Sequence, residues 1–261
     1  MQIRALAISD VSPPRYQGVS SYLVNDDLVV DAGSVGLWGD ADTQAKIGDV
    51  LLTHAHIDHV NTLPLFVENA YAPGPEAPAV HGPPEALDAV HRQLFNGEIW
   101  PDFVAMSTPE NGFMSFNPLE VERLREIAGY RVTPVAVDHG VPAYGYLVDD
   151  GAAAVVFAGD SGPTARLWEV ANAHDVKVAA VVMEASFPDE MGWLAEASFH
   201  LTPSMFADEM DKLDGAEDVA FYAVHLKPRY VERVAEQLHA LGRANLTVME
   251  MNREYDVRPR G

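Results

Sequence analysis

The segment Leu51-Leu52-Thr53-His54-Ala55-His56-Ile57-Asp58-His59 joins an apolar run, which predicts a β-strand, to a dense group of histidines and one carboxylate. Imidazole nitrogen and carboxylate oxygen are the ligands that zinc-like divalent ions prefer. Because side chains so close along one backbone cannot all reach a single ion, the spacing predicts two adjacent ions. His54 and His56 would bind one ion, and Asp58 and His59 the other. The alternative is a solvated polar loop.

The composition is that of a folded globular protein. The chain has 261 residues, of which 48% are hydrophobic and 21% charged, and this length fits one large domain or two small ones. We expect a single domain over residues 1–261. The sequence contains no cysteine, which excludes disulfides, thiolate metal sites and cysteine nucleophiles. Any metal must therefore be held by His, Asp and Glu.

The chain is strongly acidic, with a formal net charge of −22 from 39 acidic and 17 basic residues. Nucleic-acid backbones are usually bound by a basic stripe, so this balance argues against a nucleic-acid partner. A small anionic substrate remains compatible with it, because two divalent cations dominate the local field inside a site. Solubility or a salty habitat would explain the acidity equally well.

The hydropathy pattern contains no targeting or membrane segment. The N-terminal apolar run is too short for a signal peptide, and no apolar stretch is long enough to span a bilayer. We therefore expect a cytoplasmic protein without a membrane partner. The sequence leaves a homodimer open.

Apolar and alternating runs predict strands along most of the chain. They lie at residues 3–8, 19–24, 28–31, 49–53, 79–81, 131–137, 144–148, 153–158, 178–183, 219–224 and 246–250. Helical spacing predicts helices near residues 61–70, 84–95, 164–173, 203–213 and 228–241. The segment 96–118 is aperiodic but rich in aromatics, and substrate contacts concentrate in loops. Trp100 and Phe103 are therefore candidates to stack on a substrate ring, with packing in the core as the alternative.

Five of the predicted strands end in a residue that can bind a metal or transfer a proton. These residues are His54, His139, Asp160, Glu184 and His225. Because chemistry in sheet-based folds concentrates at one edge of the sheet, we expect these side chains to converge there. Taken singly, each has an ordinary explanation as a capping or turn residue.

In this arrangement the chain resembles the metallo-β-lactamase superfamily over nearly its whole length. The resemblance implies an α/β (α+β) fold, an αββα sandwich of two mixed β-sheets flanked by helices. It also implies two divalent ions, zinc in the first place, with manganese or iron as alternatives. The implied ligands are His54, His56 and His139 for one ion, Asp58, His59 and His225 for the other, and Asp160 for both.

Several stretches are similar to one branch of that superfamily, the class II cyclic-nucleotide phosphodiesterases. They are Leu94-Phe95-Asn96-Gly97-Glu98-Ile99-Trp100-Pro101, Gly159-Asp160-Ser161-Gly162-Pro163, Glu184-Ala185-Ser186-Phe187-Pro188, His200-Leu201-Thr202-Pro203 and His225-Leu226-Lys227-Pro228. The last three also resemble the ribonuclease Z branch, which cleaves tRNA at its 3′ end. The second stretch departs from the usual Gly-Asp-Thr-Gly-Pro, although its serine retains a hydroxyl.

The resemblance implies hydrolysis of 3′,5′-cyclic nucleotides, cyclic AMP or cyclic GMP, to 5′-nucleoside monophosphates. Two adjacent divalent ions activate water for attack on phosphorus, and Asp58 would help to orient that water. His200 is the candidate general acid for the departing ribose oxygen, with Glu184 hydrogen-bonded to the imidazole. An ordinary buried polar pair is the alternative for Glu184 and His200.

Three other functions stay open at this point. The first is a ribonuclease Z-like tRNA endonuclease, against which stand the acidity and the lack of an obvious basic arm. The second is another hydrolase on the same scaffold, for example one that cleaves lactones or thioesters. The third is a metal-binding module without catalysis, which is disfavoured because an acid candidate accompanies the complete ligand set.

Overall fold

The described part of the chain, residues 1–8 and 18–259 of a computed structural model, contains two β-sheets of seven strands each. The first sheet has the order β14-β1-β2-β3-β4-β5-β6. Its strands are β1 (Gln2–Ala5), β2 (Tyr22–Val24), β3 (Leu28–Val30), β4 (Asp49–Leu51), β5 (Ala79–Gly82), β6 (Ser115–Pro118) and β14 (Glu254–Asp256). The strands from β14 to β3 pair antiparallel and those from β3 to β6 pair parallel, so the sheet is mixed.

The second sheet has the order β13-β12-β11-β10-β9-β8-β7 and is also mixed. Its strands are β7 (Arg125–Ile127), β8 (Tyr130–Val137), β9 (Ala143–Asp149), β10 (Ala154–Phe157), β11 (Val178–Glu184), β12 (Ala220–Val224) and β13 (Leu246–Val248). The strands β7 to β10 pair antiparallel, and β10 to β13 pair parallel.

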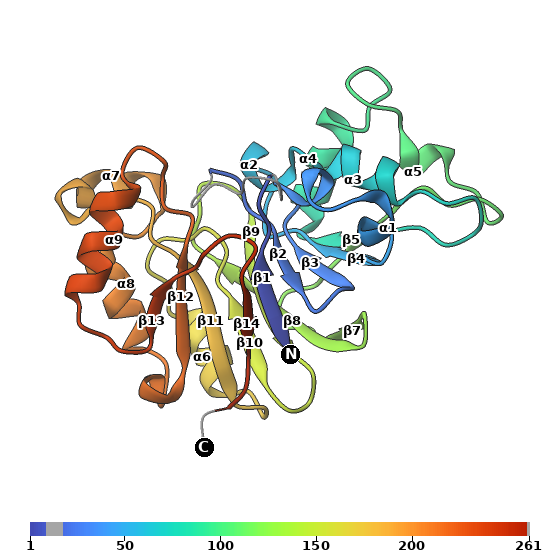
Figure 1. Cartoon of the computed structure of the whole chain (residues 1–261). Helices are drawn as coiled ribbons and strands as arrows, with labels where there is room; N and C mark the ends of the chain where they lie inside the picture. Colours follow the sequence, from blue (N-terminus) through green and yellow to red (C-terminus); the bar gives the residue numbers. More distant parts are fainter. Residues whose placement is uncertain (9–17, 260–261) are drawn as a thin grey trace.

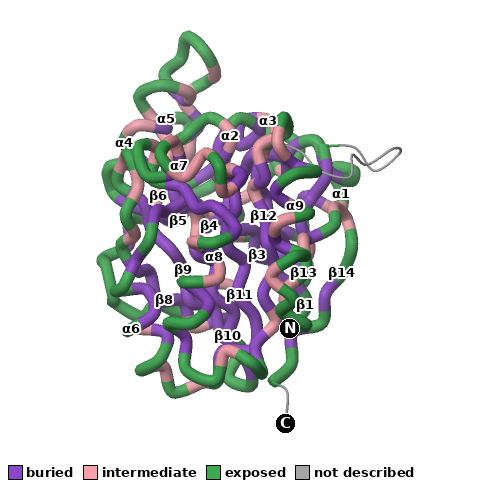
Figure 2. Tube along the Cα trace, turned by 90° about the vertical axis from the view of Figure 1, so that its left-hand side faces the viewer, coloured by how far each residue is buried: buried purple, intermediate pink, exposed green. Residues whose placement is uncertain are grey.

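The two sheets pack face to face with helices outside them, and Figure 1 shows this order of layers. Apolar side chains of both sheets, among them Val30 and Phe157, form the central core, and the inner strands are buried in Figure 2. Outside the second sheet lie α6 (Arg166–Asn172), α8 (Pro203–Met210) and α9 (Val231–Ala240). Outside the first lie α1 (Ala41–Gln44), α3 (Leu63–Ala70), α4 (Pro84–Gln93) and α5 (Phe103–Met106). The predicted αββα sandwich of two mixed sheets is confirmed.

Several short elements were not predicted from the sequence. They include the strands β6, β7 and β14 and the helices α1, α2 (Ile57–Val60), α5 and α7 (Gly192–Ser198). Each of these has seven residues or fewer, which is too short for a periodic pattern to stand out. Strand β14 exists because it pairs with β1, close to the other end of the sequence.

The predicted strand at residues 49–53 ends earlier, at Leu51. The backbone N–H of Thr53 donates to the side chain of Asp31 (2.8 Å) and not to a neighbouring strand. This side-chain hydrogen bond turns the chain out of the sheet just before His54.

The strands that precede the predicted site residues point toward one end of the sandwich. In the second sheet β10, β11 and β12 are parallel, and β8 runs with them because β9 is antiparallel to both β8 and β10. Figure 1 shows α2, which follows β4, at the upper side of the molecule, whereas the N-terminus lies in the lower half. Among the helices of residues 1–8 and 18–259, none is long and apolar enough to cross a membrane.

Candidate metal centre

The loop from His54 to His59 is held against the first sheet by its backbone. The carbonyl oxygen of Asp58 accepts a hydrogen bond from the Ser20 N–H (2.9 Å). A Cβ atom at Gly33 would lie 2.0 Å from this same carbonyl oxygen, so only glycine allows the loop to approach so closely. The short helix α2 then begins at Ile57 and presents Asp58 and His59 one after the other.

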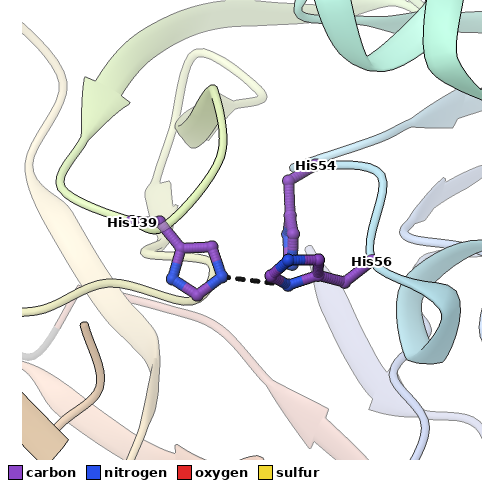
Figure 3. A group of neighbouring side chains, drawn as sticks. All are labelled: His54, His56 and His139. Atoms are coloured by element: carbon purple, nitrogen blue, oxygen red, sulfur yellow. Dashed lines mark hydrogen bonds between the residues drawn. The ribbon is translucent and has the colours of Figure 1, made fainter. Parts of the chain in front are cut away.

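The first cluster of predicted ligands consists of His54, His56 and His139, which Figure 3 draws as sticks. One ligand atom from each lies within 4.8 Å of the other two. His56 Nδ1 and His139 Nε2 are 3.1 Å apart. His139 comes from the loop after β8 in the second sheet, so this cluster joins the two halves of the sandwich.

A second cluster consists of Asp58, His59 and His225, again with ligand atoms within 4.8 Å of one another. His225 Nε2 lies 3.2 Å from Asp58 Oδ2. Asp160 lies between the clusters: its Oδ2 is 3.4 Å from His59 Nε2 and 3.3 Å from His225 Nε2. It also groups with His54 and His59. The family resemblance implies that Asp160 is shared by two ions, and this role stays a prediction.

Four of these histidines turn Nδ1 toward an oxygen of the protein and Nε2 toward the clusters. The pairs are His54 with Thr53 Oγ1 (3.0 Å), His59 with Asp31 Oδ2 (2.7 Å), His139 with the Phe199 carbonyl oxygen (3.2 Å) and His225 with Ser186 Oγ (3.1 Å). A hydrogen bond at one ring nitrogen fixes the tautomer and leaves the other nitrogen free for a metal.

The residues fit a pair of divalent ions. Among the described residues, the Nε2 atoms of His54 and His59 are buried without a hydrogen-bond partner. A buried polar atom left unpaired costs about 1–3 kcal/mol, and a pair of ions, one beside each nitrogen, would satisfy both. The donor set of imidazoles and carboxylates, without thiolates, is one that zinc, manganese and iron accept.

Burial and neighbouring charges shift the pKa values of His54, Asp160 and His59 in different directions. Burial lowers the pKa of His54 to about 2, so this imidazole is neutral at ordinary pH. Burial alone would raise the pKa of Asp160, but the neighbouring His225 and His59 hold it well below its usual range. For His59, burial acts to lower the pKa, and the carboxylates of Asp160 and Asp31 outweigh it. Asp160 is therefore an ionised ligand candidate.

Asp31 belongs to the site although the sequence reasoning treated it only as the end of a strand. Its carboxylate is buried (1% exposed). It accepts hydrogen bonds from the Thr53 N–H (2.8 Å), the Thr53 hydroxyl (2.9 Å) and His59 Nδ1 (2.7 Å). An acidic residue directly after an apolar run is the sequence feature that identified Asp160 and Glu184 as candidates. Asp31 follows the apolar run of β3 in the same way, so this feature could have identified Asp31 too.

His200 and Glu184 form a buried pair next to Asp160. Glu184 ends β11, and its Oε1 lies 2.6 Å from His200 Nδ1. Burial lowers the pKa of His200, but the hydrogen bond and charge of Glu184 outweigh burial and raise it. His200 Nδ1 is 4.0 Å from Asp160 Oδ2. A protonated imidazole at this position can donate a proton to an oxygen that leaves from the clusters.

The two predicted aromatic contacts lie in the segment between α4 and β6. Phe103 is buried, and its ring stacks on Phe113 at a centroid distance of 5.3 Å. Trp100 is half-buried against the same apolar cluster. This packing is what the alternative explanation, a core role, predicts. A substrate contact by either ring stays a prediction.

Comparison with known proteins identifies the chain's relatives. The family model of the beta-lactamase superfamily domain matches residues 37–226. A 3′,5′-cyclic-nucleotide phosphodiesterase 1 of Saccharomyces cerevisiae is 30% identical over 96 residues, 36% of this chain and 26% of the relative. A ribonuclease Z of Kineococcus radiotolerans is 28% identical over 147 residues, 53% of this chain and 45% of the relative. The aligned part thus spans less than half of either relative.

A solved structure extends the likeness to the whole fold. The crystal structure of unliganded yeast PDE1 superposes with a TM-score of 0.75 at 17% identity. The superposition covers 95% of this chain and 96% of that one. At this identity the likeness establishes the fold.

Proposed function

This chain belongs to the β-lactamase superfamily, and from that premise we propose that it hydrolyses 3′,5′-cyclic nucleotides to 5′-nucleoside monophosphates. Members of the superfamily are typically hydrolases that bind divalent metals, but the fold hosts many reactions and does not choose among them. Support for this choice comes from the partial similarity to a cyclic-nucleotide phosphodiesterase. We treat residues 1–261 as one hydrolase domain.

The observation that carries the proposal is the His200–Glu184 pair (2.6 Å) beside the two ligand clusters. The ribose 3′-oxygen of a cyclic nucleotide is a poor leaving group and needs a proton as it departs. An imidazole whose pKa is raised by a buried carboxylate keeps its proton to a higher pH than a free imidazole does. Metal ligands alone would serve a binding module equally well, whereas the added acid favours hydrolysis of a phosphodiester.

The proposal assigns each predicted site residue a role. Two divalent ions, when bound, would activate water and neutralise charge on the phosphate. The ligands would be His54, His56 and His139 for one ion and Asp58, His59 and His225 for the other, with Asp160 shared. Asp58 would also orient the attacking water, His200 would protonate the leaving oxygen, and Glu184 would hold His200 in place.

A ribonuclease Z-like activity is the second candidate, because the similarity to a ribonuclease Z covers more of this chain than the similarity to the phosphodiesterase. The net charge of −22 weighs against it, since a tRNA backbone is bound mainly through basic side chains. A small anion needs no such surface.

One assay separates the two candidates. Purified protein is incubated with Zn²⁺ or Mn²⁺ and offered cyclic AMP, cyclic GMP and a precursor tRNA in parallel. The proposal expects 5′-monophosphates from at least one cyclic nucleotide and intact RNA. Cleavage of the RNA alone would replace the proposal by its rival, and a His200→Ala control excludes a contaminating nuclease.

A further inference from the structure

Lys227 places its ammonium group at the solvent-exposed side of the candidate metal centre, which we call its mouth. Its Nζ lies 3.9 Å from Asp58 Oδ2, the same oxygen that lies 3.2 Å from His225 Nε2. The Lys227 and Asp58 side chains are 29% and 26% exposed. The ammonium therefore borders the clusters on a side that solvent, and hence a small substrate, reaches.

The backbone around Lys227 is fixed on both sides. Its N–H donates to the Ser186 carbonyl oxygen (3.2 Å), and its own carbonyl oxygen accepts from the Tyr230 N–H (2.8 Å). Two residues earlier, His225 has a left-handed φ of 57°, a conformation that non-glycine residues adopt mainly where surrounding contacts impose it. The backbone of Lys227 is therefore held in a fixed position next to the candidate ligand His225, unlike the backbone of a lysine in a free surface loop.

The charges around the clusters indicate what the Lys227 ammonium group does. Carboxylates surround the clusters, at Asp31, Asp58, Asp160 and Glu184. Together they offset part of the charge of two divalent ions and so weaken the attraction of the ions for an anion. The Asp58 carboxylate at 3.9 Å offsets part of the repulsion between this ammonium and two divalent ions, and a bound anion would offset more of it. Such an arrangement fits a phosphate group bound at the mouth.

We propose that Lys227 is the residue with which this site recognises an anionic substrate, by binding a non-bridging phosphate oxygen. The inference rests on the proposed function and adds the element that selects phosphodiesters over neutral esters. Ammonium–phosphate hydrogen bonds are charge-assisted and stronger than neutral ones. In a chain with a net charge of −22, one local cation also offsets the repulsion that an approaching anion meets.

The test compares three variants with the wild-type protein, all loaded with metal. Lys227→Met keeps the length of the side chain and removes its charge, and Lys227→Arg restores a cation. Lys177→Met is the matched control, because it changes the net charge equally but precedes β11, at the opposite end from Glu184. For each protein we would measure inorganic phosphate binding by calorimetry, KM and kcat for cyclic AMP, metal content and thermal stability.

Lys227→Met should weaken phosphate binding and raise KM by about tenfold to a hundredfold, with two ions still bound. Lys227→Arg should recover most of the affinity, and Lys177→Met should match the wild type. Wild-type phosphate affinity in Lys227→Met would overturn the inference. Loss of metal in that variant would overturn it too, because the ammonium would then serve to hold Asp58. If the wild type cleaves neither cyclic AMP nor cyclic GMP but binds phosphate through Lys227, the proposed function fails and the anion site stands.

Discussion

Replacing Asp31 by asparagine tests whether a carboxylate behind the clusters sets the metal affinity of His59. The wild-type carboxylate accepts from the Thr53 N–H (2.8 Å) and from His59 Nδ1 (2.7 Å). An amide cannot accept from both on separate oxygens. If its oxygen stays on Thr53, its NH₂ faces His59 Nδ1, and the histidine must move its proton to Nε2. That nitrogen, 3.4 Å from Asp160, would then be unable to bind a metal.

The magnitude follows from the hydrogen bond between His59 and the carboxylate, which the substitution removes. A hydrogen bond to a charged group contributes about 1.5–3 kcal/mol, and partners behind metal-binding histidines change affinity by about 10–100-fold. Since about 1.4 kcal/mol corresponds to tenfold in affinity, the two ranges agree. We expect Asp31→Asn to weaken the binding of one of the two ions by about 10–100-fold. The ion assigned to His54, His56 and His139 should change less.

The assay is a competitive chelator titration that resolves two metal equivalents, paired with thermal unfolding in EDTA to separate metal affinity from folding. Asp49→Asn is the matched control, because Asp49 also pairs with an imidazole, His81 Nε2 (2.8 Å), which is not a candidate ligand. The control should bind both ions as the wild type does. An Asp31→Asn protein that keeps both ions at wild-type affinity would refute the reasoning.

Five further variants have expected outcomes. Glu184→Gln removes the charge that keeps the pKa of His200 raised against burial, so the loss of activity with rising pH should begin at lower pH than in the wild type; an unchanged kcat–pH profile contradicts this. Asp160→Ala should lose metal and turnover together, whereas His200→Ala should keep its metal in elemental analysis and lose at least about tenfold in kcat. Glu209→Ala leaves the buried Trp168 Nε1 (2.6 Å from Glu209) unpaired and should lower the free energy of unfolding by about 3 kcal/mol, measured by urea denaturation. The exposed Arg243→Ala, which breaks the surface pair with Asp211, should cost under about 1 kcal/mol.

The sandwich and the clustering of site residues could be predicted because both follow from local patterns. His54 to His59 sit within one short segment, and His139, Asp160, Glu184 and His225 each follow an apolar run. A run of apolar residues indicates a buried strand, and strand ends collect at the edge of a sheet. The structure brings these residues together as expected.

What could not be predicted depends on contacts between distant parts of the chain. Strand β14 has an exposed residue at each end and forms through pairing with β1. Lys227 lies in a motif recognised from the sequence, but its approach to Asp58 (3.9 Å) joins two segments that follow strands of different sheets. The stacking of Phe103 on Phe113 likewise depends on how the segment 96–118 folds back on itself. No periodic pattern encodes such contacts.

The predicted ligands are divided between the halves of the sandwich: His54 to His59 extend from the first sheet, and His139, Asp160 and His225 from the second. Neither half alone presents a complete donor set for either ion. Bound metal would thus link the two halves of the sandwich, and its binding free energy would oppose their separation. A zinc chelator should therefore weaken the contacts between the two halves before it weakens those within either half. Hydrogen exchange would show this as faster exchange of the backbone amides at the boundary between the two sheets.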